Sequence, residues 1–306
     1  MIVFYQQVAA ERRKRRMEEE DDVCGGQEAL PVCGGPRGEL GPFQYTPELI
    51  AGPGADVDPS EVTIQGCECR GRSCVEGRCP CLPRGQNYVN GRVTLARDTP
   101  ILECNVLCSC AETCANRETQ RSLQFRLEVR QIPGKGWGLR TKEAIPSGRF
   151  VCEYAGEVLG EEEACLRIKS QDPTTNNYII AVREHLHDGR TLRTYVDPTR
   201  IGNIGRFLNH SCRPNLAMLP VRSHSMVPRL ALFAARDIPA GEELCYDYSG
   251  RSFNAEPPSA GDEGPGPRKR CLCGTDVCAG DLPFDGSLYG DKSPKSANHP
   301  RKSPNL

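Results

Sequence analysis

Nine cysteines between Cys67 and Cys114 follow a spacing that is typical of metal ligands. Their order is Cys67-x-Cys69-x4-Cys74-x4-Cys79-x-Cys81, then 22 residues, then Cys104-x3-Cys108-x-Cys110-x3-Cys114. An odd number of thiols cannot all pair and no export signal precedes them, so a disulfide scaffold is the disfavoured alternative. Three tetrahedral zinc ions suit nine thiolates if some sulfurs bridge two ions. We expect nearby arginines to balance the negative charge of such a cluster: Arg70, Arg72, Arg78 and Arg84.

A second cysteine group, Cys271-x-Cys273-x4-Cys278, follows much later in the chain. Zinc prefers four ligands, so either water or a distant residue must complete this set. Cys212 is the best candidate, because it lies in the unusual segment Arg206-Phe-Leu-Asn-His-Ser-Cys212-Arg-Pro-Asn215. One zinc held by these four cysteines would clamp residues 271–278 against the main domain only when the metal is bound.

Four short motifs lie in order between the two cysteine groups. They are Gly136-Trp-Gly138, Glu153-Tyr-Ala-Gly-Glu157, Arg206-Phe-Leu-Asn-His-Ser-Cys212 and Glu243-Leu-Cys-Tyr-Asp-Tyr248. With a cysteine group on either side, this order resembles the SET-domain protein-lysine methyltransferases that carry pre-SET and post-SET zinc modules. Further stretches resemble the subgroup in which such a methyltransferase is fused to a mariner transposase: Phe43–Pro47, Gly52–Asp56, Glu103–Cys108 and Leu282–Asp285. We expect neither a transposase segment nor a DNA-binding domain in this chain.

The resemblance implies methyl transfer from S-adenosylmethionine to a histone lysine. It also implies a β-rich SET fold, built from small curved sheets with a knot-like C-terminal segment. The reaction is an in-line displacement by a neutral amine, so positioning and electrostatics matter more than acid–base chemistry. Gly136 would let the backbone approach the cofactor closely, and His210 is expected to fix a loop rather than act as a base. The family's cofactor-binding positions correspond here to Lys135, Gly136, Trp137, Tyr178, Arg206, Asn209 and His210.

Four tyrosines are the expected catalytic residues. Tyr248 is the main candidate, because its hydroxyl would align the incoming amine and keep it uncharged. Tyr178 is expected to line the lysine channel, and Tyr154 is a weaker candidate for the same wall. Tyr246 occupies a position where the family has Phe or Tyr, and its hydroxyl would leave little room for a third methyl group. The expected product is therefore mono- and dimethyl-lysine. For Tyr248, Tyr178 and Tyr154, the alternative is a buried tyrosine of the core.

Short β-type runs with Gly and Pro between them begin near residue 121 and predict a β-rich domain. The runs are Phe125–Val129, Phe150–Tyr154, Tyr178–Val182, Thr194–Val196 and Leu230–Ala234. One helix is predicted over 160–171, where charged residues flank Ala164, Leu166 and Ile168. The 22 residues between the two halves of the cysteine cluster are expected to loop out.

These patterns divide the chain into six parts. They are a flexible N-terminus (1–45, with Cys24 and Cys33 as free thiols), the pre-SET module (46–120), the SET catalytic domain (121–250), a disordered linker (251–270), the post-SET module (271–287) and a disordered tail (288–306).

Composition and charge limit the partners of this 306-residue chain. The formal net charge is −1, so no global basic field attracts nucleic acid. The N-terminus is not a secretory signal, and no stretch approaches the ~20 apolar residues of a membrane span. The 18 cysteines then indicate a reducing compartment. The basic run 12–16 is either a nuclear-import signal or an exposed helix end. We expect a protein of the nucleus and the chromosome, with a histone tail peptide (H3) and chromatin as partners.

Two other functions stay open at this point. One is a zinc-rich binding module with an inactive SET fold, which need not bind S-adenosylmethionine. The other is an active methyltransferase that acts mainly on non-histone proteins. The choice of peptide depends on the region near 183–200, where a peptide is expected to add a strand to a sheet edge.

Overall fold

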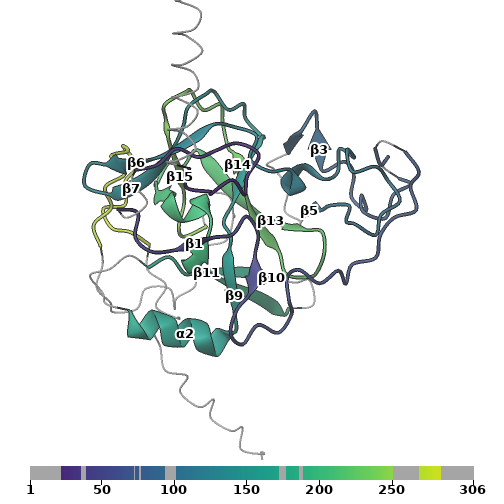
Figure 1. Ribbon diagram of the computed structural model, residues 1–306, viewed down its shortest axis with the longest axis horizontal. Coiled ribbons are helices and arrows are strands. Elements are labelled where there is room, and N and C mark those ends of the chain that lie inside the picture. The colour runs from purple at the N-terminus through teal and green to yellow at the C-terminus, as the bar shows by residue number, and fades with distance from the viewer. Residues whose placement is uncertain are drawn as a thin grey trace, which may run out of the picture.

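The computed structural model describes residues 22–35, 39–71, 73–75, 77–93, 101–171, 177–185, 189–250 and 269–283. Within these residues, a body of three small sheets carries one α-helix at its edge and a cysteine-rich lobe at its side (Figure 1). The predicted β-rich fold is confirmed. The basic run 12–16, the segment 251–268 and the tail beyond 283 lie outside the described residues, so the expectations about them stay predictions.

The largest sheet has five strands in the order β1-β11-β9-β2, with β10 paired to β11. Helix α2 (Glu161–Ser170) packs against this sheet and confirms the predicted helix. Its first turn is acidic, which suits the positive end of the helix dipole, and Ala164 and Ile168 face inward one turn apart. Leu166 is exposed. The strands are β1 (Gln44–Tyr45), β2 (Ile50–Ala51), β9 (Gly156–Leu159), β10 (Ile180–His185) and β11 (Thr191–Gly202).

The second sheet positions the site and has the order β12-β15-β7-β6. Strand β15 (Glu243–Tyr246) lies between a parallel partner, β12 (Asn209–His210), and an antiparallel partner, β7 (Gly136–Thr141). The late strand is therefore inserted between two earlier ones, as the knot-like prediction requires. Strand β6 (Leu127–Ile132) completes the sheet, and the 3-10 helix η2 (Ile204–Phe207) directly precedes β12.

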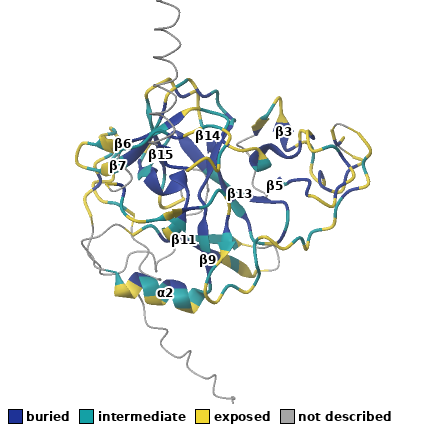
Figure 2. Cartoon of the chain, in the orientation of Figure 1, coloured by how far each residue is buried: buried dark blue, intermediate teal, exposed yellow. Residues whose placement is uncertain are grey.

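The third sheet joins the cysteine-rich lobe to the body. Its order is β5-β13-β14-β8, and its central strands supply fully buried side chains such as Leu230 and Phe233 (Figure 2). Its strands are β5 (Ile101–Leu102), β8 (Phe150–Glu153), β13 (Leu216–Arg222) and β14 (Arg229–Ala234). The remaining elements are the hairpin β3 (Tyr88–Val89) and β4 (Arg92–Val93), and the 3-10 helix η1 (Glu118–Gln120).

The prediction that the 22 residues between the cysteine halves loop out is wrong for the residues described. Tyr88 stacks on Phe233 with ring centroids 6.2 Å apart, and the Val93 amide donates to the Gly148 carbonyl at 2.8 Å. Ile101 is 1% exposed and belongs to β5, which pairs with β13. This segment therefore docks the lobe onto the body, because its apolar residues pack in the core while both of its ends lie in the cysteine cluster.

The prediction of a flexible N-terminus is also wrong for residues 22–35 and 39–45. Cys24 and Val32 are fully buried and belong to the main hydrophobic core. The Asp22 carboxylate accepts hydrogen bonds from three backbone amides, those of Cys24, Gly26 and Val32. Glycine and proline content suggested flexibility, but a few apolar side chains and one buried carboxylate are enough to fix this irregular segment. Cys24 and Cys33 lie outside the cysteine clusters, as predicted.

Among the residues that the structure describes, none of the helices has the length and apolar character needed to cross a membrane.

Candidate active site and zinc-binding clusters

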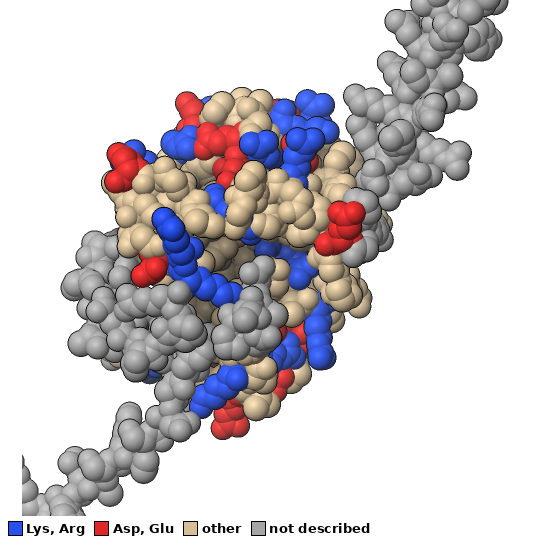
Figure 3. Space-filling model, turned by 90° about the vertical axis from the view of Figure 1, so that its left-hand side faces the viewer, with Lys and Arg blue, Asp and Glu red and all other residues tan. Residues whose placement is uncertain are grey.

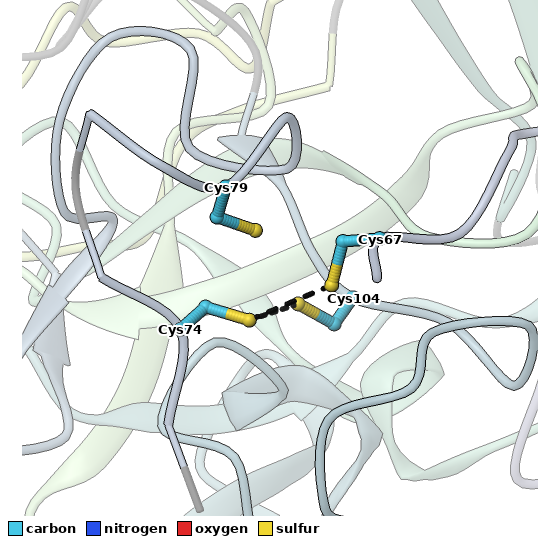
Figure 4. A group of neighbouring side chains, drawn as sticks. All are labelled: Cys67, Cys74, Cys79 and Cys104. Atoms are coloured by element: carbon cyan, nitrogen blue, oxygen red, sulfur yellow. Dashed lines mark hydrogen bonds between the residues drawn. The ribbon is translucent and has the colours of Figure 1, made fainter. Parts of the chain in front are cut away.

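The nine predicted cysteines of the lobe gather into one sulfur-rich core. Eight of them are buried, and Cys69 packs against them partly exposed. Three overlapping groups place four sulfurs within 4.8 Å of one another: Cys67/Cys74/Cys79/Cys104, Cys67/Cys104/Cys108/Cys110 and Cys74/Cys104/Cys110/Cys114. Figure 4 shows the sulfurs of the first group pointing toward one another, with Cys74 Sγ 3.6 Å from Cys67 Sγ and 3.5 Å from Cys104 Sγ. Groups of four thiols that share members fit zinc ions joined by bridging thiolates.

Two predicted ligands lie at the border of this cluster. Cys81 Sγ is 3.8 Å from Cys108 Sγ, but neither Cys81 nor Cys69 belongs to one of the three groups. The positive partner of the sulfurs also differs from the expectation. Arg117, which is 7% exposed, donates to Cys110 Sγ at 3.6 Å. The expected arginines Arg70, Arg78 and Arg84 are exposed, and Arg72 lies outside the described residues.

The second cysteine group is completed as predicted. Cys212, Cys271, Cys273 and Cys278 bring their sulfurs within 4.8 Å of one another, although Cys212 comes from the loop after β12. Two contacts hold the loop there: the Ala279 amide donates to Cys212 Sγ at 3.4 Å, and Arg213 pairs with Asp276. Burial raises the pKa of Cys273, but hydrogen bonds from Thr275 and the backbone lower it more strongly, to about 6. An all-thiol set of four with one acidic member fits a tetrahedral zinc ion.

The first residues of β7 bring backbone close to Asn209. Gly136 has φ +84°, which favours glycine, and a Cβ at Gly138 would lie 2.9 Å from Asn209 Nδ2 and 2.4 Å from Ile132 Cγ1. Asn209 Nδ2 donates to the Trp137 carbonyl at 3.3 Å and to Glu243 Oε1 at 2.9 Å. The structure thus brings the Gly136-Trp-Gly138 motif, which opens β7, together with the Asn-His pair, as the sequence predicted.

Glu243 is a residue of the candidate site that sequence reasoning missed. Its carboxylate also accepts from Lys135 Nζ at 2.8 Å, so that one acidic group fixes two predicted cofactor-binding residues. Burial lowers the pKa of Lys135, but the hydrogen bond that Lys135 donates to Glu243 and nearby negative charge outweigh this effect, and the pKa is raised. The only available signal was that Glu243 opens the last of the four motifs.

The side chain of Trp137 contacts the N-terminal segment. Its indole Nε1 donates to the Glu39 carbonyl at 3.1 Å, and a Cβ at Gly35 would lie 2.6 Å from its ring. The backbone of Trp137, through its carbonyl, is what reaches Asn209. The predicted cofactor contact of this residue therefore rests on its backbone, among the contacts that the structure describes.

His210 connects the loop that carries Cys212 to Tyr248, the main predicted catalytic residue. Its Nδ1 accepts from the Tyr248 amide at 3.2 Å, so its Nε2, 3.3 Å from Cys212 Sγ, carries the proton and donates to the sulfur. Burial lowers the pKa of His210, which favours this neutral form. The arrangement supports a structural role for His210 rather than a role as a base.

Three of the four predicted catalytic tyrosines lie side by side. The Tyr246 ring centroid is 4.8 Å from that of Tyr248 and 6.2 Å from that of Tyr154. The Tyr248 hydroxyl donates to the Leu208 carbonyl at 2.8 Å, and the Tyr154 hydroxyl donates to the Tyr178 carbonyl at 2.5 Å. Burial raises the pKa of Tyr154, Tyr246 and Tyr248, so all three remain protonated at neutral pH. Tyr248 is still 41% exposed, so a substrate can reach it.

Arg206 is a buried cation without an acidic partner among the described contacts. It is 8% exposed, and its Nε and Nη1 have no hydrogen-bond partner. Its Cζ lies 4.3 Å from the Phe43 ring centroid and 4.7 Å from that of Tyr178. Burial lowers the pKa of Arg206. Buried donors without acceptors are costly, so they indicate a place for a polar ligand.

The residues present fit S-adenosylmethionine on these observations. Three features offer hydrogen bonds to an amino acid and a nucleoside. They are the unpaired donors of Arg206, the open backbone at Gly136 and the Asn209–Glu243–Lys135 network. Leu272 of the post-SET loop lies against Gly134, because a Cβ added at Gly134 would be 3.3 Å from Leu272 Cδ1. Figure 3 shows the side of the molecule on which β6, β7 and the post-SET segment lie in Figure 1. This side is hollowed near its centre, and Lys and Arg side chains lie around the hollow.

Two family models match the chain. The SET domain model matches residues 136–249, and the Pre-SET motif model matches residues 29–117. The first range contains the four tyrosines, and the second contains all nine cysteines of the lobe. The Pre-SET range begins within the N-terminal segment that packs on the core, which agrees with the structure rather than with the predicted boundary at residue 46.

Fold, site and sequence matches together show that the chain belongs to the SET-domain family of histone-lysine N-methyltransferases, in the class with a pre-SET module. Within this family it is similar to the rat histone-lysine N-methyltransferase SETMAR, with 56% identity over 271 residues, 85% of this chain and 84% of the relative. The predicted likeness is confirmed. The chain spans 40% of the length of human SETMAR, to which it is 54% identical.

Solved structures agree with this assignment. The methyltransferase domain of human SETMAR matches with a TM-score of 0.80 and 52% identity, over 87% of this chain and 99% of that domain. KRYPTONITE, solved with DNA, an H3(1-15) peptide and SAH, matches with a TM-score of 0.66 and 31% identity, over 86% of this chain and 53% of that chain.

Proposed function

We propose that this protein transfers methyl groups from S-adenosylmethionine to a lysine of a histone tail, with H3 as the histone. The observation that carries the proposal is the cluster of Tyr246, Tyr248 and Tyr154 beside the Asn209–His210 strand. The tyrosines and the Asn209–His210 strand lie together because β15 inserts between β12 and β7. The KRYPTONITE structure, which contains an H3 peptide, supports the choice of histone. The nucleus and the chromosome are the corresponding location, with chromatin as the partner.

The proposed role of Tyr248 follows from its hydrogen bond. S-adenosylmethionine, when bound, supplies an electrophilic methyl group on a sulfonium. Because the Tyr248 hydroxyl uses its one O–H to donate a hydrogen bond to the Leu208 carbonyl, its oxygen can act only as an acceptor toward the substrate. An acceptor can hold an N–H of a neutral lysine amine and direct the amine lone pair toward the methyl group. The raised pKa of Tyr248, caused mainly by burial, keeps it a phenol, so it positions the amine rather than acting as tyrosinate.

Tyr154 and Tyr178 form the proposed wall of the lysine channel. The hydrogen bond from the Tyr154 hydroxyl fixes the Tyr178 backbone, and the Tyr178 ring lies over the Arg206 guanidinium. In this arrangement Tyr178 contributes to both the channel and the cofactor pocket. Lys135, Gly136, Trp137, Asn209 and His210 form the rest of the proposed cofactor site, mainly through the backbone and the Glu243 network.

Tyr246 is the proposed determinant of product state. It is 6% exposed and packs between Tyr154 and Tyr248. Among the described residues its hydroxyl has no protein hydrogen-bond partner, so the hydroxyl is free to bond the amine or a water beside it. That group takes the space of a third methyl, and mono- and dimethyl-lysine are the proposed products.

The zinc content we propose is three ions in the pre-SET cluster and one in the post-SET site. The three overlapping groups of sulfurs support the first number, and the single four-cysteine group supports the second. The first cluster is far from the tyrosines and would stabilise its lobe. The second would hold one edge of the active site, because Cys212 directly follows the Asn209–Ser211 segment.

The experiment is transfer of radiolabelled methyl from S-adenosylmethionine to core histones, with mass spectrometry of the products. Tyr248→Phe should lower turnover about 100-fold or more, because it removes the positioning acceptor. Tyr195→Phe is the matched control: it removes the hydroxyl of a tyrosine outside the cluster, buried beside α2, and should keep wild-type turnover. Equal turnover by Tyr248→Phe and wild type would contradict the mechanism. Cofactor binding without histone labelling would favour a non-histone substrate, and no cofactor binding would favour an inactive binding module.

A further inference from the structure

Phe43 comes from the N-terminal segment, well before the SET-domain match, yet it lies in the proposed cofactor pocket. It immediately precedes β1, whose register pairs Gln44 with Ile201 and Tyr45 with Gly202 on β11. The Thr46 amide adds a hydrogen bond of 3.0 Å to the Gly202 carbonyl. Since η2 follows β11 by one residue, this pairing fixes Phe43 beside η2.

Phe43 contacts two residues of η2. Its ring packs edge-on against Phe207, with centroids 5.8 Å apart, and its face lies 4.3 Å from Cζ of Arg206. Two further rings lie within reach of the guanidinium: that of Tyr178, at 4.7 Å, and that of Phe207, at 5.3 Å. A guanidinium over an aromatic face is attracted by the quadrupole of the ring, more strongly where water is excluded.

Arg206 depends on these rings, because the described residues offer its buried Nε and Nη1 no acceptor. A carboxylate partner would occupy the donors, whereas an aromatic face holds the cation and leaves its edge unsatisfied. The planar edge of a guanidinium is well suited to carbonyl and carboxylate oxygens. The aromatic contacts thus fix the position of the cation while they keep its donors available.

We propose that Phe43 is a positioning residue for the cofactor site, which acts by holding the Arg206 guanidinium against Tyr178 with its donors free for the ligand. The inference rests on the proposed function, since S-adenosylmethionine is the ligand that the site would take. It makes the N-terminal segment part of the catalytic unit. It also assigns a function to a residue that lies outside the matched SET domain.

The test measures binding of S-adenosylhomocysteine by calorimetry, and KM and kcat for S-adenosylmethionine, with the full chain loaded with zinc. Phe43→Leu keeps apolar bulk but removes the aromatic face, and should weaken binding and raise KM about 3- to 30-fold. Its kcat should stay within about 2-fold, since the tyrosines are untouched. Phe43→Tyr restores an aromatic face and should bind nearly as well as wild type.

Phe125→Leu is the matched control, because Phe125 is a partly buried ring under another arginine, with Arg149 Cζ at 5.5 Å from its centroid. It should not change binding. In an Arg206→Gln background, Phe43→Leu should have no further effect on binding, and an additive loss there would overturn the proposal. Wild-type affinity in Phe43→Leu, or an equal loss in Phe43→Tyr, would also overturn it. Failure of the wild-type protein to bind S-adenosylhomocysteine would overturn the proposed function and, with it, this inference.

Discussion

Replacing His210 with alanine should weaken the post-SET zinc site and the position of Tyr248 together. The imidazole donates to Cys212 Sγ at 3.3 Å and accepts from the Tyr248 amide at 3.2 Å. A hydrogen bond to a charged thiolate contributes about 1.5–3 kcal/mol, and a neutral one about 1 kcal/mol. The loss on the zinc side therefore corresponds to about 10- to 150-fold weaker metal binding. Outer-shell partners of zinc ligands generally have effects of about 10- to 100-fold, which agrees with this value.

The assay is competition with a colorimetric zinc chelator, followed by turnover on histones. At a chelator concentration that leaves wild type loaded, His210→Ala should release one zinc ion of the proposed four and lose activity in parallel. His224→Ala is the control, because its ring bonds only to the neighbouring Ser223 among the described contacts. Retention of every zinc ion by His210→Ala would refute the proposed link. Loss of turnover with zinc retained would restrict the role of His210 to Tyr248.

Three further outcomes are expected. Tyr246→Phe should shift the product toward trimethyl-lysine in mass spectra, because it removes the hydroxyl that takes up space; an unchanged product distribution would contradict the proposed role. Cys273→Ser should lower turnover at least about 100-fold while the core stays folded, as judged by circular dichroism. Full turnover would refute the proposal that the post-SET zinc site holds one edge of the active site. Burial raises the pKa of Glu242, but hydrogen bonds from Arg236 and Asn215 outweigh it, so the pKa lies below its ordinary value of 4.5. The stabilisation by Glu242, about 0.5–1 kcal/mol for a part-exposed pair, is therefore present above pH 4.5 and is lost as the pH falls through the lowered pKa. The gap in Tm between wild type and Glu242→Gln should then shrink between pH 5 and pH 3, whereas acid-induced loss of zinc affects both proteins.

Local patterns predicted the strands and the helix more successfully than they predicted long-range packing. Helix α2 was predicted because its apolar residues Ala164 and Ile168 and its acidic first turn are local features. The strands β7, β9, β13 and β15 were not among the predicted runs. Their residues contain Gly, Pro and charged side chains, and each of these strands pairs with a strand far along the chain: β7 with β15, β9 with β11 and β13 with β5.

The site residues, like the strands, were predicted where a local pattern marks them and missed where only long-range contacts define them. Cysteine spacing predicted the clusters, because three of the four cysteines in each group lie close along the chain. The short motifs predicted the tyrosines and the Asn-His pair. Arg117 as the charge partner of Cys110, Glu243 as the link to Lys135 and Phe43 as the contact of Arg206 were missed. Each of these contacts joins residues whose types are common and whose spacing carries no pattern.

The sequence by itself determined the chemistry of this protein: thiolates in metal-binding order, a glycine turn for a cofactor, and tyrosines in a motif that resembles a methyltransferase. These are properties of residue type and short-range spacing. Only the tertiary structure decided which of them meet. The insertion of β15 between β12 and β7 places the tyrosines beside Asn209 and His210, and pairing of β1 with β11 brings Phe43 to Arg206. Contacts of this kind depend on packing and backbone pairing between distant segments. No local sequence pattern encodes the free energy of those interactions.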